Sequence, residues 1–110
     1  PPLEAIAEEL GLDEEQYVEI LMDFIEDKKK DMADLSDALV QGDAELVSRL
    51  AHKIKGSALN LRLDSLARPA VNIEKAAKEG NVSQIASDWD DLSREFDALC
   101  GMRKRHGSGA

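Results

Sequence analysis

His52 is the residue of this sequence whose type and position point most directly to chemistry. If residues 43–61 form a helix with about 100° between successive side chains, the apolar residues of the segment share one side: Val47, Leu50, Ala51, Ile54, Ala58 and Leu61. His52 then falls on the opposite side. The sequence therefore predicts an exposed imidazole and not a histidine buried in a core. A surface histidine often has no role, so evidence for a function of His52 must come from the residues around it.

Lys55 and Gly56 lie one turn after His52 and share its face of the predicted helix. Helical side chains lean towards the N-terminus, so the Lys55 ammonium can reach back over the imidazole. A cation there disfavours the imidazolium form, keeps the ring neutral as a nucleophile must be, and can pair with an anion attached to the ring. Gly56 costs about 1 kcal/mol relative to alanine inside a helix, but it leaves room for another molecule to approach His52.

The charges are unevenly distributed along the chain. The 110 residues hold 14 Lys and Arg against 23 Asp and Glu, a net charge of −9 at pH 7. The segment between residues 49 and 68 reverses this balance, with five basic residues (Arg49, Lys53, Lys55, Arg62 and Arg68) and one acid, Asp64. A basic island around an exposed histidine suits a dianionic phosphoryl group. The acidic remainder argues against general nucleic-acid binding.

Other catalytic chemistries find little support. The glycines are scattered, so no phosphate-binding loop for a nucleotide is visible. A Ser-His-Asp set is disfavoured because Ser48 is near His52 but the nearest acid, Glu45, is about two turns away on the predicted helix. A metal site needs more than His52 and His106. The single cysteine, Cys100, allows no disulfide within the chain and suggests no function of its own.

The elements that must position His52 are predicted to be helices. Apolar residues recur at helical spacing in five segments, at about residues 3–10, 13–41, 43–61, 64–79 and 81–99, with Lys28 as the one interruption of the second. Gly11, Gly42 and Gly80 separate them, and Asn81 with Gln84 resembles a capping box. We expect an all-α fold over residues 1–102, an antiparallel up-down-up-down four-helix bundle with a short N-terminal capping helix. Residues 103–110 are expected to form a flexible basic and Gly/Ser tail.

The segment His52-Lys53-Ile54-Lys55-Gly56-Ser57-Ala58 resembles the histidine-containing phosphotransfer (HPt) family. The family's signature is His, any residue, an aliphatic residue, Lys, Gly, and Ser or Ala, on the second long helix of a four-helix bundle. Asn60-Leu61, Ile73-Glu74 and Gly80-Asn81 fit the same pattern, which covers about residues 13–99. One departure is Arg62, where many members have glycine, and it leaves open how the third helix ends.

The resemblance implies a phosphorelay function. His52 would accept a phosphoryl group on its outer ring nitrogen from a receiver-domain phospho-aspartate or a histidine kinase, and pass it to a response-regulator aspartate. Lys55 would steady the phosphoryl charge and Gly56 would give access, while Glu74 or Lys78 of the next helix would hydrogen-bond the histidine. Magnesium would belong to the partner, and the domain would need no cofactor and have no kinase activity.

Docking of the partner is expected on the outer face of the His52 helix, at Ser48, Arg49, Lys53, Leu59 and Arg62. No apolar run approaches the roughly 18 residues of a membrane span, so we expect a cytoplasmic domain without membrane contact, either alone or as part of a hybrid sensor kinase. Two alternatives stay open. The bundle can be an adaptor that binds a receiver without carrying phosphate, or a helical dimerisation domain.

Overall fold

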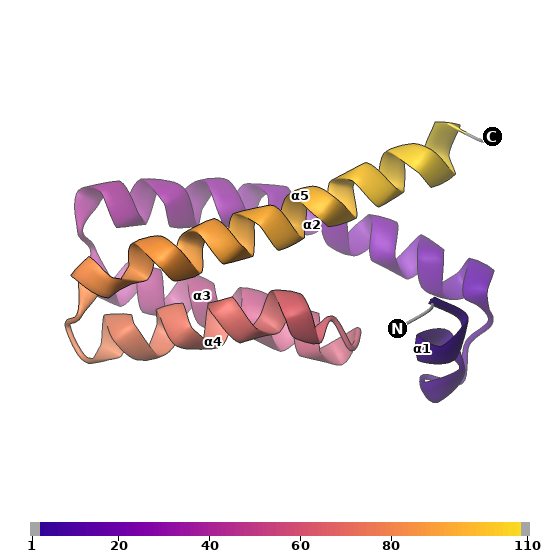
Figure 1. Ribbon diagram of the computed structural model, residues 1–110, viewed down its shortest axis with the longest axis horizontal. Helices are drawn as coiled ribbons and strands as arrows, with labels where there is room; N and C mark the ends of the chain where they lie inside the picture. The colour runs from indigo at the N-terminus through magenta and orange to yellow at the C-terminus, as the bar shows by residue number, and fades with distance from the viewer. Residues whose placement is uncertain (1–2, 109–110) are drawn as a thin grey trace.

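The structure is a computed structural model that describes residues 3–108, with the side chains of 82 and 103–108 left out. It contains helices α1 (Leu3–Glu9), α2 (Glu14–Gln41), α3 (Ala44–Asn60), α4 (Asp64–Lys78) and α5 (Ile85–Ser108), and a 3₁₀ turn, η1 (Val82–Gln84). No strand occurs in this range. Helices α2 to α5 run alternately up and down, and α1 lies beside the N-terminal end of α2 (Figure 1). The predicted all-α bundle is confirmed.

Local signals in the sequence explain where the helices around the site begin and end. Asp13 and Gln16 form a capping box at the start of α2, in which the Asp13 carboxylate accepts from the Gln16 N–H at 2.8 Å. Gly42 ends α2 with a left-handed backbone, φ 69°. The Asp43 carboxylate then caps α3 by accepting from the Leu46 N–H at 3.1 Å. These short connections force α2 and α3 to pack as antiparallel neighbours.

The starts of α4 and α5 depend on the backbone. The N-cap of α4 is Leu63, whose side chain makes no capping hydrogen bond. In place of the predicted capping box at Asn81 and Gln84, the backbone forms η1, in which the Gln84 N–H donates to the Asn81 carbonyl at 3.2 Å. Helix α5 therefore begins at Ile85.

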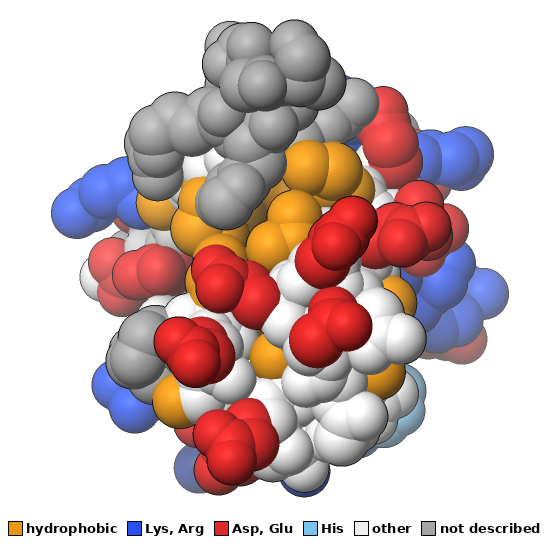
Figure 2. All heavy atoms as spheres, turned by 90° about the vertical axis from the view of Figure 1, so that its right-hand side faces the viewer, with side chains coloured by type: hydrophobic (Ala, Val, Ile, Leu, Met, Phe, Trp, Pro, Cys, Tyr) orange, Lys and Arg blue, Asp and Glu red, His pale blue; other side chains and the backbone are white. Residues whose placement is uncertain are grey.

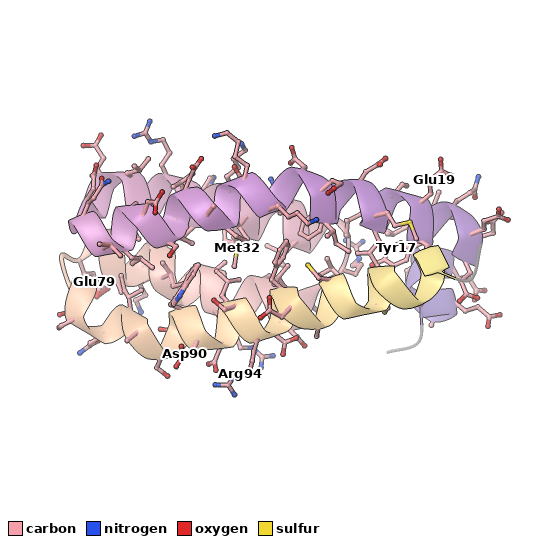
Figure 3. The ribbon with its side chains drawn as sticks, turned by 90° about the horizontal axis from the view of Figure 1, so that it is seen from above. Tyr17, Glu19, Met32, Glu79, Asp90 and Arg94 are labelled. Carbon is pink, nitrogen blue, oxygen red and sulfur yellow. The ribbon has the colours of Figure 1, made fainter. Side chains whose placement is uncertain are left out.

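The core lies between the four long helices and is built from the apolar faces that the periodicity predicts. On α3 the buried residues are Val47, Ala51, Ile54 and Ala58, each at most 1% exposed. Tyr17 and Met32 point into the space between α2 and α5, whereas Glu19 and Arg94 point outwards (Figure 3). The packing of this core determines which face of α3 is exposed to solvent.

The turn between α3 and α4 is held by backbone and side-chain hydrogen bonds. The Leu63 N–H donates to the Ala58 carbonyl at 2.9 Å and the Arg62 N–H to the Leu59 carbonyl at 3.1 Å, the two bonds of a Schellman motif. Arg62 takes the left-handed position of this motif with φ 60°, a conformation that favours glycine. The buried Tyr17 hydroxyl donates to the Leu61 carbonyl at 2.6 Å and ties this turn to α2.

Helix α5 extends into the C-terminal region of the chain. The backbone of residues 103–108 continues α5, in the region where the sequence predicts a flexible tail, and residues 109–110 of that tail lie outside the described residues. None of the helices between residues 3 and 108 combines the length and the apolar composition that a membrane crossing needs.

Candidate functional site

His52 projects from α3 away from the core. Its side chain is 66% exposed, while its neighbours Ala51 and Ile54 are at most 1% exposed. The helical periodicity of α3 explains this difference in exposure. Its apolar residues form a stripe along one side of the helix, and His52 lies on the other side.

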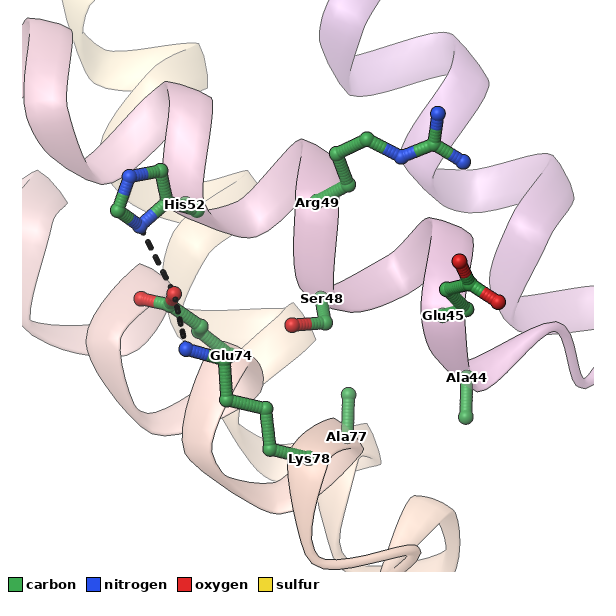
Figure 4. Close-up of a pocket in the computed structure, with 8 residues that line it drawn as sticks. All are labelled: Ala44, Glu45, Ser48, Arg49, His52, Glu74, Ala77 and Lys78. Carbon is green, nitrogen blue, oxygen red and sulfur yellow. Dashed lines mark hydrogen bonds and ion pairs between the residues drawn. The ribbon is translucent and has the colours of Figure 1, made fainter.

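Glu74 of α4 organises the polar contacts of His52. The Glu74 side chain is only 8% exposed, and its Oε2 lies 2.8 Å from His52 Nδ1. The other carboxylate oxygen, Oε1, accepts from Lys55 Nζ at 2.7 Å. Lys78 Nζ lies 3.0 Å from Oε2. Figure 4 shows His52 and Lys78 reaching Glu74 from α3 and α4. A buried carboxylate is thus satisfied by one ring nitrogen and two ammonium groups.

The charge state of Glu74 decides which ring nitrogen of His52 carries a proton. Burial raises the pKa of Glu74, but hydrogen bonds from Lys55, Lys78 and His52 outweigh this effect and lower it from 4.5 to about 2. At neutral pH the group is therefore a carboxylate, which can only accept hydrogen bonds. It follows that His52 Nδ1 carries a hydrogen and donates it to Glu74.

The second ring nitrogen, Nε2, is the reactive candidate. In the neutral ring with a hydrogen on Nδ1, Nε2 holds a free lone pair. Figure 4 shows Nε2 on the edge of the ring that faces away from Glu74. An exposed nitrogen lone pair on an oriented ring is a nucleophile that can reach an electrophile on another molecule.

Lys55 and Gly56 occupy the same face as His52 but differ in what they contact. The sequence predicts a Lys55 ammonium over the imidazole, whereas in the structure this ammonium binds Glu74 and its side chain is 24% exposed. A Cβ added to Gly56 would meet no heavy atom within 4 Å. Packing within the chain therefore does not require glycine at this position.

An open groove of about 650 Å³ runs beside His52 between α3 and α4. Its lining is shared by the two helices and consists of Ala44, Glu45, Ser48, Arg49, His52, Glu74, Ala77 and Lys78. Two residues of the predicted docking face, Ser48 and Arg49, therefore lie in the groove with His52.

The other residues of the predicted docking face lie outside this groove. Leu59 is 44% exposed further along α3, and the exposed Arg62 lies in the turn that follows, where its guanidinium contacts the Leu59 carbonyl at 3.4 Å. Lys53 turns towards α2, where its Nζ lies 3.3 Å from Asp31 Oδ1. The predicted face is thus spread along the whole of α3.

Sequence reasoning missed Asp31. The available signal was Lys28, whose charge interrupts the apolar face of α2 and requires a partner if it is buried. In the structure Lys28 is 2% exposed and Asp31, one turn later, is 5% exposed. Among the residues the structure describes, no group of three or more His, Cys, Asp or Glu side chains is arranged to hold a metal ion.

Comparison with known proteins gives one match. The family model of the Hpt domain matches residues 19–102, which include most of α2 and all of α3 and α4. No curated protein and no solved structure matches the chain. The matched segment contains His52, Lys55, Gly56 and Glu74.

Proposed function

The chain belongs to the Hpt domain family, whose members are phosphotransfer modules of phosphorelay signalling and not kinases, and on this premise we propose that His52 is its phosphoacceptor. His52 accepts a phosphoryl group from the phospho-aspartate of a receiver domain or from a histidine kinase, and passes it to a response-regulator aspartate. One observation carries the proposal. The His52 side chain is 66% exposed, and its Nδ1 donates a hydrogen bond to the buried Glu74. This contact leaves Nε2 free to react.

The transfer from a phospho-aspartate balances without any further reactant. The Nε2 lone pair forms a bond to phosphorus, and the bond from phosphorus to the aspartate oxygen breaks, with its electron pair leaving on the carboxylate. The ring gains positive charge in this step because its Nδ1 keeps the hydrogen. Glu74, with a pKa of about 2, remains ionised and stabilises that charge across the 2.8 Å contact. The return step to another aspartate is the same exchange in reverse.

The surroundings of His52 support close approach of a protein partner. The free space at Gly56 allows the partner's backbone or side chains to come within contact distance of the ring. Lys55 and Lys78 keep Glu74 charged and add positive potential for the phosphoryl oxygens. The docking face combines Ser48, Arg49, Lys53, Leu59 and Arg62, and its area is at the small end of interfaces because a relay must release its partner.

The partner supplies the remaining chemistry. We assign the acceptor or donor aspartate and the magnesium ion to the receiver domain, and no cofactor to this chain. We also assign the domain to the cytoplasm, where its single cysteine stays reduced.

Phosphoryl transfer from a phosphorylated receiver domain tests the proposal. We expect acid-labile, base-stable label on the wild-type chain and none on His52→Gln, whose fold is intact because the side chain is exposed. His106→Gln is the matched control, since His106 is the one other histidine of the chain, and it should label normally.

Two outcomes would contradict the proposal. Unchanged labelling of His52→Gln would exclude His52 as the acceptor. Binding of receiver domains by the wild-type chain without any label would favour the adaptor function instead.

A further inference from the structure

Asp31 of α2 is a second buried carboxylate that contacts α3. Its Oδ2 accepts from the buried Lys28 Nζ at 2.9 Å, and its Oδ1 accepts from Lys53 Nζ at 3.3 Å. Lys28 also lies 3.1 Å from the exposed Asp27. Asp31 therefore links the interior of the bundle to Lys53, the residue that directly follows His52 on α3.

Stability alone does not explain a buried ion pair at this position. Removing two charges from water costs several kcal/mol per ion, and well-packed apolar residues of similar size often stabilise a fold as well or better. Burial raises the pKa of Asp31, but hydrogen bonds and charge from Lys28, and then from Lys53, lower it below its ordinary value. Asp31 is therefore ionised at neutral pH and can hold a cation.

The cation that Asp31 holds at the surface is Lys53, whose side chain is 59% exposed. A free lysine side chain loses about 2 kcal/mol of rotamer entropy when it is fixed in one contact. Asp31 fixes Lys53 before a partner arrives. Lys28 is shared between Asp31 and Asp27, so the charges of these four side chains balance, and Lys53 is the cation among them that is exposed to a partner.

Arg49 is a second exposed cation of α3 and offers a comparison with Lys53. It lies one turn before Lys53, is exposed, and has no ion-pair partner among the described side chains. Arg49 and Lys53 are thus two exposed cations of α3 close to His52, and Lys53 is the one held in place by a buried residue of α2.

We propose that Asp31 is a positioning residue for partner recognition, which holds Lys53 beside His52 as a fixed cation for an acidic receiver-domain surface. This inference rests on the proposed function, since the partner is the protein that brings the phospho-aspartate. Asp31 acts through Lys53 and does not touch the reacting atoms.

A double-mutant cycle on receiver binding tests the inference. The dissociation constant is measured by titration calorimetry for the wild type, Asp31→Asn, Lys53→Met and the double variant. We expect each single variant to weaken binding about threefold, and the double variant to be no weaker than Lys53→Met. Asp34→Asn is the matched control, because it removes an acid of the same helix that pairs with Lys30 instead. It should leave affinity unchanged.

Additive losses in the double variant would overturn the inference, because a merely structural role of Asp31 acts equally with and without Lys53. Equal or tighter binding by Asp31→Asn would overturn it as well. If Asp31→Asn does not fold, the variant with Lys28→Met and Asp31→Leu replaces the buried pair by apolar residues. Its helicity should be normal and its affinity about threefold weaker, and wild-type affinity would refute the inference.

The experiments distinguish a failure of this inference from a failure of the proposed function. A wild-type chain that binds and labels normally but shows no coupling between Asp31 and Lys53 would overturn the inference alone. A wild-type chain that binds no receiver domain would overturn both.

Discussion

Replacing Gly56 by alanine should make the protein more stable and its phosphoryl transfer slower. Gly56 lies inside α3, and an added Cβ meets no heavy atom within 4 Å. The substitution therefore carries no steric penalty in the free chain. It gains the full difference in helix propensity, about 1 kcal/mol in the free energy of unfolding. For a chain of this size that is about 4 °C in melting temperature.

Urea unfolding and a transfer assay measure the two effects separately. With a denaturant slope of about 2 kcal/mol/M, a gain of about 1 kcal/mol moves the urea midpoint up by about 0.5 M. The transfer rate from a phosphorylated receiver should fall, because the new methyl group occupies the space through which the partner approaches His52. Gly42→Ala is the matched control. Its left-handed φ of 69° makes alanine destabilising there, and Gly42 ends α2 outside the groove beside His52.

Two results would refute this reasoning. Loss of stability in Gly56→Ala would mean that the chain itself needs glycine at this position. A gain in stability with an unchanged transfer rate would mean that the partner does not approach His52 over Gly56.

Acid should weaken the fold through Glu74. Because folding lowers the pKa of Glu74 from 4.5 to about 2, its contribution to stability is complete above pH 4.5 and is lost as the pH falls towards 2. Urea unfolding at several pH values should show this loss in the wild type and less of it in Glu74→Gln, and equal slopes would contradict the assignment. Arg62→Gly should raise the free energy of unfolding by up to about 1 kcal/mol, since it removes a left-handed arginine, and lower stability in the same measurement would contradict that reading. Lys55→Ala should slow transfer while circular dichroism shows near-normal helicity, because Glu74 keeps its contacts with Lys78 and His52. An unfolded Lys55→Ala variant would instead make Lys55 structural.

The sequence predicts the exposure of His52 because that property depends on one helix only. Apolar residues at helical spacing define the buried stripe of α3, and a residue opposite that stripe faces solvent whichever helices cover the stripe. The starts and ends near Asp13, Gly42 and Asp43 are predictable for the same reason, since caps are local.

Contacts between helices could not be predicted from periodicity. His52 and Glu74 are 22 residues apart, and their 2.8 Å contact depends on the rotation and offset of α3 against α4. Family resemblance narrowed the partner to Glu74 or Lys78, and the structure has Glu74 on the ring with Lys78 on Glu74. Asp31 was missed because its burial depends on how α2 packs against α3.

The bundle also exposes apolar side chains at one of its ends. At the end where α1 and the C-terminal part of α5 lie, apolar side chains are exposed between acidic ones (Figure 2). A groove there is lined by residues that include Leu3, Ile6, Leu63 and Leu99.

The central claim is that His52 is phosphorylated on Nε2. Its most direct test is to identify the histidine nitrogen that carries phosphorus. The wild-type chain, labelled with ¹⁵N at histidine, is phosphorylated by a receiver domain and studied by ¹H–¹⁵N and ³¹P NMR. We predict a single phosphorylated histidine, His52, with phosphorus on Nε2 and a hydrogen retained on Nδ1 towards Glu74. Phosphorus on Nδ1, or on a residue other than His52, would contradict this prediction.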